Sequence, residues 1–311
     1  DLLRIANSAS RTGRKMMPVD CISLKSLSKN HDYLNKCTHY GVDLIKKGAV
    51  AAFVVAGGQG SRLGFEGPKG AFPVSAVKNK TLFQLHAEKV LSASKKYNST
   101  ITFLIMTSKA NHSATVAEFE KNSYFGLDHK NVHIFPQNMI PSLDIEGKLI
   151  LSGKTSLFRN PDGHGGSLTA LESSGALDKI MSQGVEFISY FQVDNPLINI
   201  IDPLFFGIHG IEKSELSSKA LIKAYPDEKV GIFVKYDDST VGVEEYSDLP
   251  KEVLSARDSD GSLLYKWGSI GIHVFSCSFI KRNISGGEIN LPFHVARKKI
   301  KAYVKGETKE I

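Results

Sequence analysis

The chain has 311 residues, of which 41% are hydrophobic and 23% are charged, and these proportions are ordinary for a globular protein. Its net charge of +7 comes from dispersed basic residues without a basic-and-aromatic motif. We therefore interpret the charge as solvated surface that at most steers polyanionic small molecules, and we expect no nucleic acid as a partner. No run approaches the roughly 18 apolar residues that cross a bilayer, so no membrane partner is expected either.

The first 48 residues are polar and favour helix, with a break at Pro18 and a helix predicted over residues 32–47. We expect this segment, residues 1–48, to brace the main domain. Apolar strands and helices then alternate, with strands at 50–55, 101–107, 132–135 and 187–193 and helices at 82–94, 114–121 and 168–183. This alternation predicts an α/β fold with a Rossmann-like, mostly parallel mixed sheet and helices on both faces.

The pattern changes from about residue 219, where short strands are separated by turns such as Ser259-Asp260-Gly261. We expect these strands to add hairpins to the central sheet. The predicted elements are strands at 219–225, 230–236, 241–246, 263–265 and 267–275, and a helix at 293–298.

The three cysteines, Cys21, Cys37 and Cys277, are too few and too scattered for a disulfide framework or a zinc site. Reduced thiols are typical of the cytosol, and the first residues lack the apolar core of a signal peptide. These features predict a cytoplasmic protein.

The strand at 50–55 runs directly into a glycine-rich loop that carries two cations, Arg62 and Lys69. The loop reads Ala-Gly-Gly-Gln-Gly-Ser-Arg-Leu-Gly over residues 56–64, and Pro68-Lys69-Gly70 follows. Glycines let backbone N–H groups approach a phosphate closely, and fixed cations neutralise its charge. The Walker triplet Gly-Lys-Ser/Thr is absent, and the glycine spacing differs from the dinucleotide pattern Gly-x-Gly-x-x-Gly. What remains resembles the signature of nucleotidyltransferases that join a sugar 1-phosphate to a nucleoside triphosphate.

Two further segments lie where ligands of a parallel sheet bind, beyond the carboxyl ends of the strands. Asp194 and Asn195 end the strand at 187–193. A carboxylate at this place either binds Mg²⁺, which prefers oxygen ligands, or forms a turn or helix cap. Gln137 follows the strand at 132–135 and offers both a donor and an acceptor, as reading a uracil edge requires, although alone it reads as a surface residue.

A second glycine-rich turn, residues 160–166, precedes a helix and contains Gly163 and His164. Backbone at such a helix start can approach a base or sugar closely, and His164 either contacts the ligand or is a structural turn residue. Lys223 and Glu245 each either face solvent or contact a ligand, through its phosphate and its sugar hydroxyls respectively. His273, in the middle of a strand, is interpreted as a core histidine.

Together these segments resemble the eukaryotic-type UDP-N-acetylhexosamine pyrophosphorylase family over residues 17–300. Besides the glycine loop, the resemblance rests on a series of motifs that follow one another in the family's order. They are Lys80-Thr81-Leu82-Phe83-Gln84, Ile105-Met106-Thr107-Ser108, Tyr124-Phe125-Gly126-Leu127, Gln137-Asn138-Met139-Ile140-Pro141, Pro161-Asp162-Gly163, Val193-Asp194-Asn195, Glu245-Tyr246-Ser247 and His294-Val295-Ala296.

The resemblance implies a Mg²⁺-dependent reaction in which UTP and a hexose 1-phosphate give a UDP-sugar and pyrophosphate. Arg62 and Lys69 would be the catalytic residues facing the triphosphate, and Asp194 would bind the metal. Two sets of binding residues are also implied: Ala56, Gly57, Gly58, Gln137 and Gly163 for the nucleotide, and His164, Asn195, Lys223, Gly231 and Glu245 for the sugar phosphate.

The resemblance also implies a division of the chain. Residues 49–300 would form the catalytic nucleotidyltransferase domain, and residues 301–311 the start of a C-terminal segment that continues further in the family.

Two positions depart from the family pattern. His164 stands where the N-acetylhexosamine members usually have asparagine, and residues 268–273 read Gly-Ser-Ile-Gly-Ile-His in place of Gly-Asn-Ile-x-Asn-His. N-Acetylglucosamine 1-phosphate is the first expected substrate. The departures keep open a UDP-glucose or UDP-galactose pyrophosphorylase, and a non-catalytic nucleotide-sugar binding protein is the third alternative.

Overall fold

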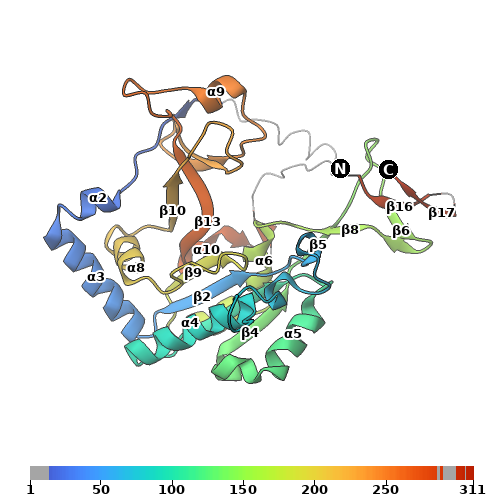
Figure 1. Cartoon of the computed structure of the whole chain (residues 1–311), viewed down its shortest axis with the longest axis horizontal. Helices are drawn as coiled ribbons and strands as arrows, with labels where there is room; N and C mark the ends of the chain where they lie inside the picture. The colour runs from blue at the N-terminus through green and yellow to red at the C-terminus, as the bar shows by residue number, and fades with distance from the viewer. Residues whose placement is uncertain (1–13, 286–287, 290–298, 305) are drawn as a thin grey trace.

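The computed structural model describes residues 14–285, 288–289, 299–304 and 306–311. Within these residues a nine-stranded sheet has the order β1-β11-β13-β9-β2-β3-β4, with β10 also paired to β13 and β12 to β11 (Figure 1). Its four parallel strands are β9 (Phe187–Gln192), β2 (Val50–Val55), β3 (Thr102–Thr107) and β4 (Val132–Pro136). Its antiparallel strands are β13 (Trp267–Ser276), β10 (Leu216–Ile222), β11 (Ile232–Tyr236), β12 (Val241–Glu244) and β1 (Met16–Met17).

Helices cover both faces of the parallel half, because successive side chains of a strand point to opposite faces. In β2, Ala52 and Val54 belong to one core, and Ala51 and Phe53 belong to the other. The first core is completed by α3 (His31–Lys46), α4 (Leu82–Tyr97), α5 (His112–Lys121) and α8 (Pro203–Ile211). The second is completed by α6 (Gly166–Ser173), α7 (Ala176–Ser182) and α10 (Cys277–Asn283). These layers confirm the predicted α/β fold.

Helix α3 of the N-terminal segment crosses α8 at very short range. A Cβ atom at Gly41 of α3 would collide with the carbonyl of Pro203, and one at Gly207 of α8 would collide with the carbonyl of Cys37. Two glycines therefore let the helix backbones touch. This contact attaches α3 to the sheet domain, while the division of the chain at residue 48 stays a prediction.

Several element boundaries differ from the sequence-based expectation. The helix expected over residues 168–183 is split into α6 and α7 at Gly175, whose φ of +73° favours glycine and ends a helix. The strand expected at 219–225 is shifted to Leu216–Ile222, and at 263–265 only an isolated bridge between Arg257 and Leu263 forms. The helix expected at 293–298 lies outside the described residues.

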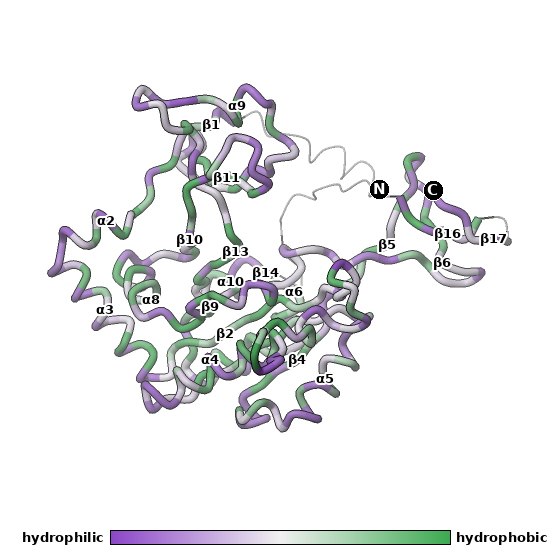
Figure 2. Tube along the Cα trace, in the orientation of Figure 1, coloured by the Kyte–Doolittle hydropathy of each residue, from purple (hydrophilic) through white to green (hydrophobic). Residues whose placement is uncertain are grey.

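Two hairpins form an arm that extends away from the sheet (Figure 1). In it β5 (Met139–Pro141) pairs with β8 (Arg159–Pro161), and β6 (Leu151–Gly153) pairs with β7 (Ser156–Leu157). The C-terminal hairpin of β16 (Lys301–Val304) and β17 (Glu307–Glu310) lies against β6. Figure 2 shows the hydrophobic residues gathered on the central strands, whereas the arm carries a mixture. The remaining short elements are α2 (Leu24–Leu27), α9 (Lys251–Ser255), β14 (Ile284–Ser285) and β15 (Glu288–Ile289).

Candidate active site

The glycine loop begins where β2 ends and is closed by its own backbone. The N–H of Gly60 donates to the carbonyl of Gly67 at 2.9 Å, and the N–H of Lys69 donates to the carbonyl of Gly58 at 3.0 Å. A left-handed Gly64 (φ +66°) closes the short helix η1 (Ser61–Leu63), a conformation that favours glycine. Arg62 lies on η1 and is exposed. The loop is thus a preformed turn that presents Arg62 and Lys69 on one short segment.

Gln137 and Lys69 lie beside the two adjacent glycines of the loop. A Cβ atom at Gly57 would lie 3.4 Å from Nε2 of Gln137, and one at Gly58 would lie 3.6 Å from Cε of Lys69. Gln137 is only 6% exposed, and its backbone N–H donates to the carbonyl of Thr107 at 2.7 Å. The parallel sheet therefore brings Gln137, from the end of β4, to the loop after β2.

Asn111 holds this loop from the side, and sequence reasoning missed it. Its buried amide nitrogen donates to the carbonyls of Ala56 at 2.9 Å and Gly58 at 3.2 Å. Its amide oxygen accepts from the N–H of Ser108 at 2.8 Å. An asparagine directly before a helix would be interpreted as an N-cap, but its side chain makes no capping bond to α5. Only the tertiary structure reveals that it supports the loop.

Lys69 and Asp194 meet at the carboxyl ends of β2 and β9. The ammonium of Lys69 is 2.9 Å from Oδ2 of Asp194, and their side chains are 26% and 48% exposed. Asn195, the next residue, is half-buried, and its N–H donates to the carbonyl of Gln192 at 3.3 Å. This turn places a carboxylate and a cation beside the glycine loop with access to solvent.

Two side chains of α4 fix the backbone around Asp194. His86, which is fully buried, contacts the carbonyl of Val193 through Nε2 at 2.8 Å. Burial lowers the pKa of His86 to about 4, so its ring is neutral at neutral pH and Nε2–H is the donor. Lys89 donates to the carbonyl of Ile198 at 2.8 Å and also contacts that of Pro196. Neither residue was singled out from the sequence, because an isolated polar residue in a helix carries no signal of its tertiary partner.

His164 lies at the start of α6, where its Nδ1 is 2.9 Å from the hydroxyl of Tyr190. Desolvation by surrounding protein atoms lowers the pKa of His164, while the carboxylates of Asp194 and Glu245 act in the opposite direction. His164 is therefore within electrostatic reach of both carboxylates, and the residue as a whole is exposed. Beside it, a Cβ atom at Gly163 would meet no protein atom within 4 Å, which leaves open space at the turn.

Gly231, directly before β11, and Glu245, directly after β12, lie side by side. A Cβ atom at Gly231 would lie 3.7 Å from Oε1 of Glu245. Lys223 behaves differently, because it is only 4% exposed and its ammonium donates to the carbonyl of Pro226 at 2.7 Å. Burial lowers the pKa of Lys223, against the opposite effect of nearby carboxylates. Its ammonium is thus engaged by a local backbone carbonyl.

Residues 268–273, which depart from the family's sequence pattern, lie within β13, the strand that pairs with β9. Gly271 has a φ of +66°, and a Cβ atom there would lie 2.5 Å from Nε2 of Gln192. His273 bonds through Nδ1 to the hydroxyl of Ser218 at 2.7 Å, and burial lowers its pKa to about 4. His273 is thus a half-buried histidine whose Nδ1 has a partner, and its interpretation as a core histidine stays a prediction.

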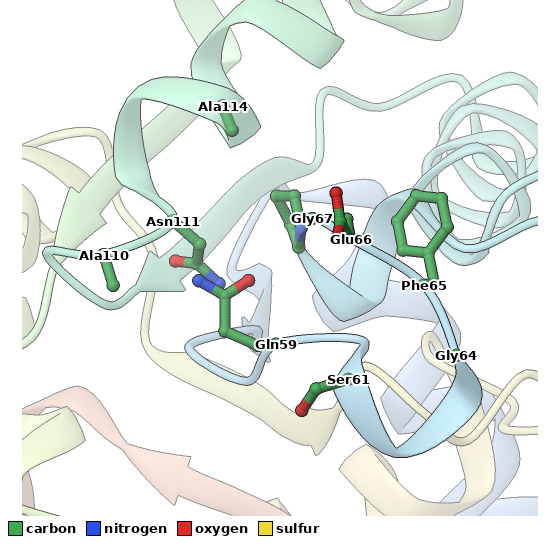
Figure 3. Close-up of a pocket in the computed structure, with 10 residues that line it drawn as sticks. Gln59, Ser61, Gly64, Phe65, Glu66, Gly67, Ala110, Asn111 and Ala114 are labelled. Carbon is green, nitrogen blue, oxygen red and sulfur yellow. The ribbon is translucent and has the colours of Figure 1, made fainter. Parts of the chain in front are cut away.

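A hollow of about 610 Å³ opens between the glycine loop and the start of α5. Figure 3 shows the amides of Gln59 and Asn111 at one end of it and Phe65 at the other. The hollow adjoins the loop, but the residues predicted for uridine and sugar, such as Gln137 and His164, are not among those described as lining it. Within the described part of the chain, no group of three or more His, Cys, Asp or Glu side chains is placed to hold a metal ion. No described helix is both long and apolar enough to cross a membrane.

A mixed α/β sheet with a closed glycine loop, two cations and a carboxylate at its carboxyl edge is typical of α/β proteins that handle nucleotides. The sequence profile of the UTP–glucose-1-phosphate uridylyltransferase family matches residues 8–308, and the chain belongs to this family. This match, together with relatives named UDP-N-acetylglucosamine pyrophosphorylase or diphosphorylase, confirms the resemblance to the UDP-N-acetylhexosamine pyrophosphorylases.

Three relatives define the likeness further. The chain is 34% identical over 303 residues to the UDP-N-acetylglucosamine pyrophosphorylase of Saccharomyces cerevisiae, covering 96% of this chain and 63% of that protein. It is 35% identical to UDP-N-acetylglucosamine diphosphorylase 2 of Arabidopsis thaliana, covering 91% and 59% respectively. The crystal structure of the uridine diphosphate N-acetylglucosamine pyrophosphorylase of Trypanosoma brucei, in complex with an inhibitor, matches with a TM-score of 0.88 and 27% identity, covering 99% and 63%. The chain thus spans less than two thirds of the length of each of these relatives.

Proposed function

We propose that this protein is a uridylyltransferase that joins UTP and a hexose 1-phosphate to give a UDP-sugar and pyrophosphate. The observation that carries the proposal is the 2.9 Å pair of Lys69 and Asp194 beside a closed glycine loop, at the carboxyl edge of parallel strands. The names of the family and of the relatives support the same reaction.

The nucleotide would bind at the loop after β2. Gln137 offers an amide donor and acceptor to the uracil edge, next to the backbone of Ala56, Gly57 and Gly58. Gly163 would line the same nucleotide from the start of α6. Arg62 and Lys69 would contact the triphosphate, because both cations lie on the loop that approaches it.

The chemistry requires alignment and charge neutralisation. An ionised oxygen of the sugar phosphate attacks the α-phosphorus of UTP, the new P–O bond forms, and the bond to the β-phosphate breaks to release pyrophosphate. The attacking oxygen carries no proton, so no general base is needed. Arg62 and Lys69 stabilise the charge that develops on the phosphates.

Asp194 is the residue that fits a magnesium ion. Its carboxylate is a hard oxygen ligand, and about half of its side chain is exposed to solvent. With no cluster of three potential ligands among the described residues, the substrate phosphates would supply the other oxygens, which is usual for Mg²⁺. The ion would neutralise phosphate charge at this place. Lys69 holds the carboxylate in position from the loop.

We propose N-acetylglucosamine 1-phosphate as the first substrate, on the names of the relatives. His164, Asn195, Gly231 and Glu245 would surround the sugar phosphate, and the engaged Lys223 would do so only after leaving the carbonyl of Pro226. His164 and the missing asparagines of residues 268–273 favour glucose or galactose 1-phosphate as the alternative. The compartment proposed is the cytoplasm, where the unpaired thiols of the three cysteines would stay reduced.

One assay tests the proposal and its alternatives. Pyrophosphate release is measured with UTP, Mg²⁺ and a panel of hexose 1-phosphates. Turnover that prefers N-acetylglucosamine 1-phosphate is the expected result, and a preference for glucose or galactose 1-phosphate would identify the alternative enzyme. If no sugar phosphate is turned over but nucleotide sugars raise the melting temperature, the protein binds without catalysis and the proposal is wrong.

A further inference from the structure

Tyr190 is a buried side chain that contacts His164, one of the residues proposed for the sugar phosphate. It lies on β9, only 4% of it is exposed, and its ring packs edge-on against Phe53 at 5.4 Å and Phe275 at 5.7 Å between centroids. These contacts from β2 and β13 fix the direction of the ring. The hydroxyl therefore stands at a defined point, where it meets Nδ1 of His164 at 2.9 Å.

The direction of this hydrogen bond follows from the third partner, Ser167. The hydroxyl of Ser167 lies 2.5 Å from the carbonyl of His164 but 3.4 Å from the hydroxyl of Tyr190, so its proton goes to the carbonyl. The best acceptor left for the phenol proton of Tyr190 is Nδ1 of His164. That nitrogen then carries no proton of its own, and in a neutral imidazole the proton is on Nε2.

Both groups are neutral near pH 7, which agrees with this arrangement. Burial raises the pKa of Tyr190 to about 12. Desolvation lowers the pKa of His164, partly offset by Asp194 and Glu245. Both carboxylates therefore act on His164 at the same time.

We propose that Tyr190 is a positioning residue that holds His164 as the Nε2–H tautomer, so that Nε2 donates a hydrogen bond to an oxygen of the bound sugar. The inference rests on the proposed uridylyltransferase function. An asparagine at position 164, as in the family pattern, offers both a donor and an acceptor, whereas this imidazole offers only a donor. The sugar site of this chain therefore requires an acceptor oxygen at that point, from a hydroxyl or an acetamido group.

Tyr190→Phe tests the inference, because it removes one oxygen and keeps the ring that packs in the core. Without its partner, His164 no longer holds one tautomer and one rotamer. We expect the KM for the preferred sugar 1-phosphate to rise about fivefold to tenfold, the size of one lost hydrogen bond. The KM for UTP should change less than about twofold on the same scale, since the nucleotide contacts are untouched. Tyr33→Phe is the matched control, because it also removes a hydrogen-bonded phenol hydroxyl, which on α3 donates to Glu212 and belongs to no predicted site residue.

A double-mutant cycle separates positioning from a structural role. In a His164→Ala background the Tyr190→Phe change should have no further effect on the KM for the sugar phosphate, because the side chain that Tyr190 positions is gone. If Tyr190→Phe raises both KM values equally, or raises the sugar KM fully in the His164→Ala background, Tyr190 acts through the fold and the inference is wrong.

A measurement without turnover keeps the inference distinct from the proposed function. The ¹⁵N chemical shifts of His164 in histidine-labelled protein report which ring nitrogen carries the proton. We expect the Nε2–H form in the unmodified protein and a mixture of both tautomers in Tyr190→Phe. A predominant Nδ1–H form in the unmodified protein would overturn the inference, even in an active enzyme. Absence of turnover with the expected tautomer would instead reject the proposed function.

Discussion

The nucleotide half and the sugar half of the candidate site are built in different ways. The proposed nucleotide half centres on one loop, which is closed by its own backbone between Gly58 and Lys69 and held by the amide of Asn111, with Gln137 beside Gly57. The proposed sugar half is assembled from the start of α6, the turn after β9, the start of β11 and the end of β12. The comparison teaches that the first half depends on local backbone geometry and the second on side chains that meet only in the folded protein.

Removing a loop cation should have the largest effect. Because we propose that Lys69 and Arg62 face the charge that develops on the phosphates, Lys69→Ala and Arg62→Ala should each lower kcat for pyrophosphate release by on the order of 10²-fold or more. Lys154→Ala, which removes one exposed charge from the arm, is the matched control. Near-normal kcat in both loop variants would show that this half of the site is not catalytic.

Removing Asn111, which holds the glycine loop, should have the second-largest effect. Asn111→Ala leaves the buried carbonyl of Ala56 without its side-chain donor, and the carbonyl of Gly58 keeps only the N–H of Lys69. This loss costs about 1–3 kcal/mol of unfolding free energy and misplaces the loop. We expect kcat/KM for UTP to fall roughly tenfold, the kinetic equivalent of about 1.4 kcal/mol. Asn122→Ala, which removes an exposed amide bonded to the carbonyl of Glu118, is the control for urea denaturation and kinetics. If the Asn111→Ala protein is as active and as stable as this control, Asn111 does not support the glycine loop.

A smaller effect is expected in the sugar half. His164→Asn restores the residue of the family pattern, and we expect the ratio of kcat/KM for N-acetylglucosamine 1-phosphate over glucose 1-phosphate to rise by about threefold to tenfold, the worth of one hydrogen bond. The KM for UTP should stay within about twofold of the original value on that scale. A changed KM for UTP with an unchanged sugar ratio would mean that the two halves are not separable in this way.

The smallest effect concerns pH and the backbone around Asp194. Burial lowers the pKa of His86 from 6.5 to about 4, so the unfolded chain binds a proton that the folded protein does not. Stability should therefore be lost as the pH falls from about 6.5 towards 4, with a slope of up to about 1.4 kcal/mol per pH unit for each such group. His209 and His273 act in the same direction. Urea titrations of His86→Gln should show a shallower slope than the unmodified protein, and an equal slope would exclude this role of His86.

Much of the fold followed from patterns that are local in the sequence. The apolar run at residues 50–55 is β2 to the residue, because a strand buried on both faces needs no partner information to be found. The helix expected at 168–183 was wrong in its middle, where the left-handed Gly175 separates two helices of one apolar pattern. Helices α8 and α10 were not predicted, since their short apolar runs do not differ from those of strands.

For the candidate site, the sequence by itself determined the loop, its two cations and the carboxylate after β9, because glycines and charges at the end of an apolar strand have few other uses. The same local motifs also predicted the family to which the chain belongs. Only the tertiary structure decided that Lys69 meets Asp194, that Asn111 carries the loop carbonyls, and that Tyr190 orients His164. The physical reason is that a hydrogen bond between distant segments leaves no periodicity in the sequence, and its partners become neighbours only when the sheet brings the strand ends together.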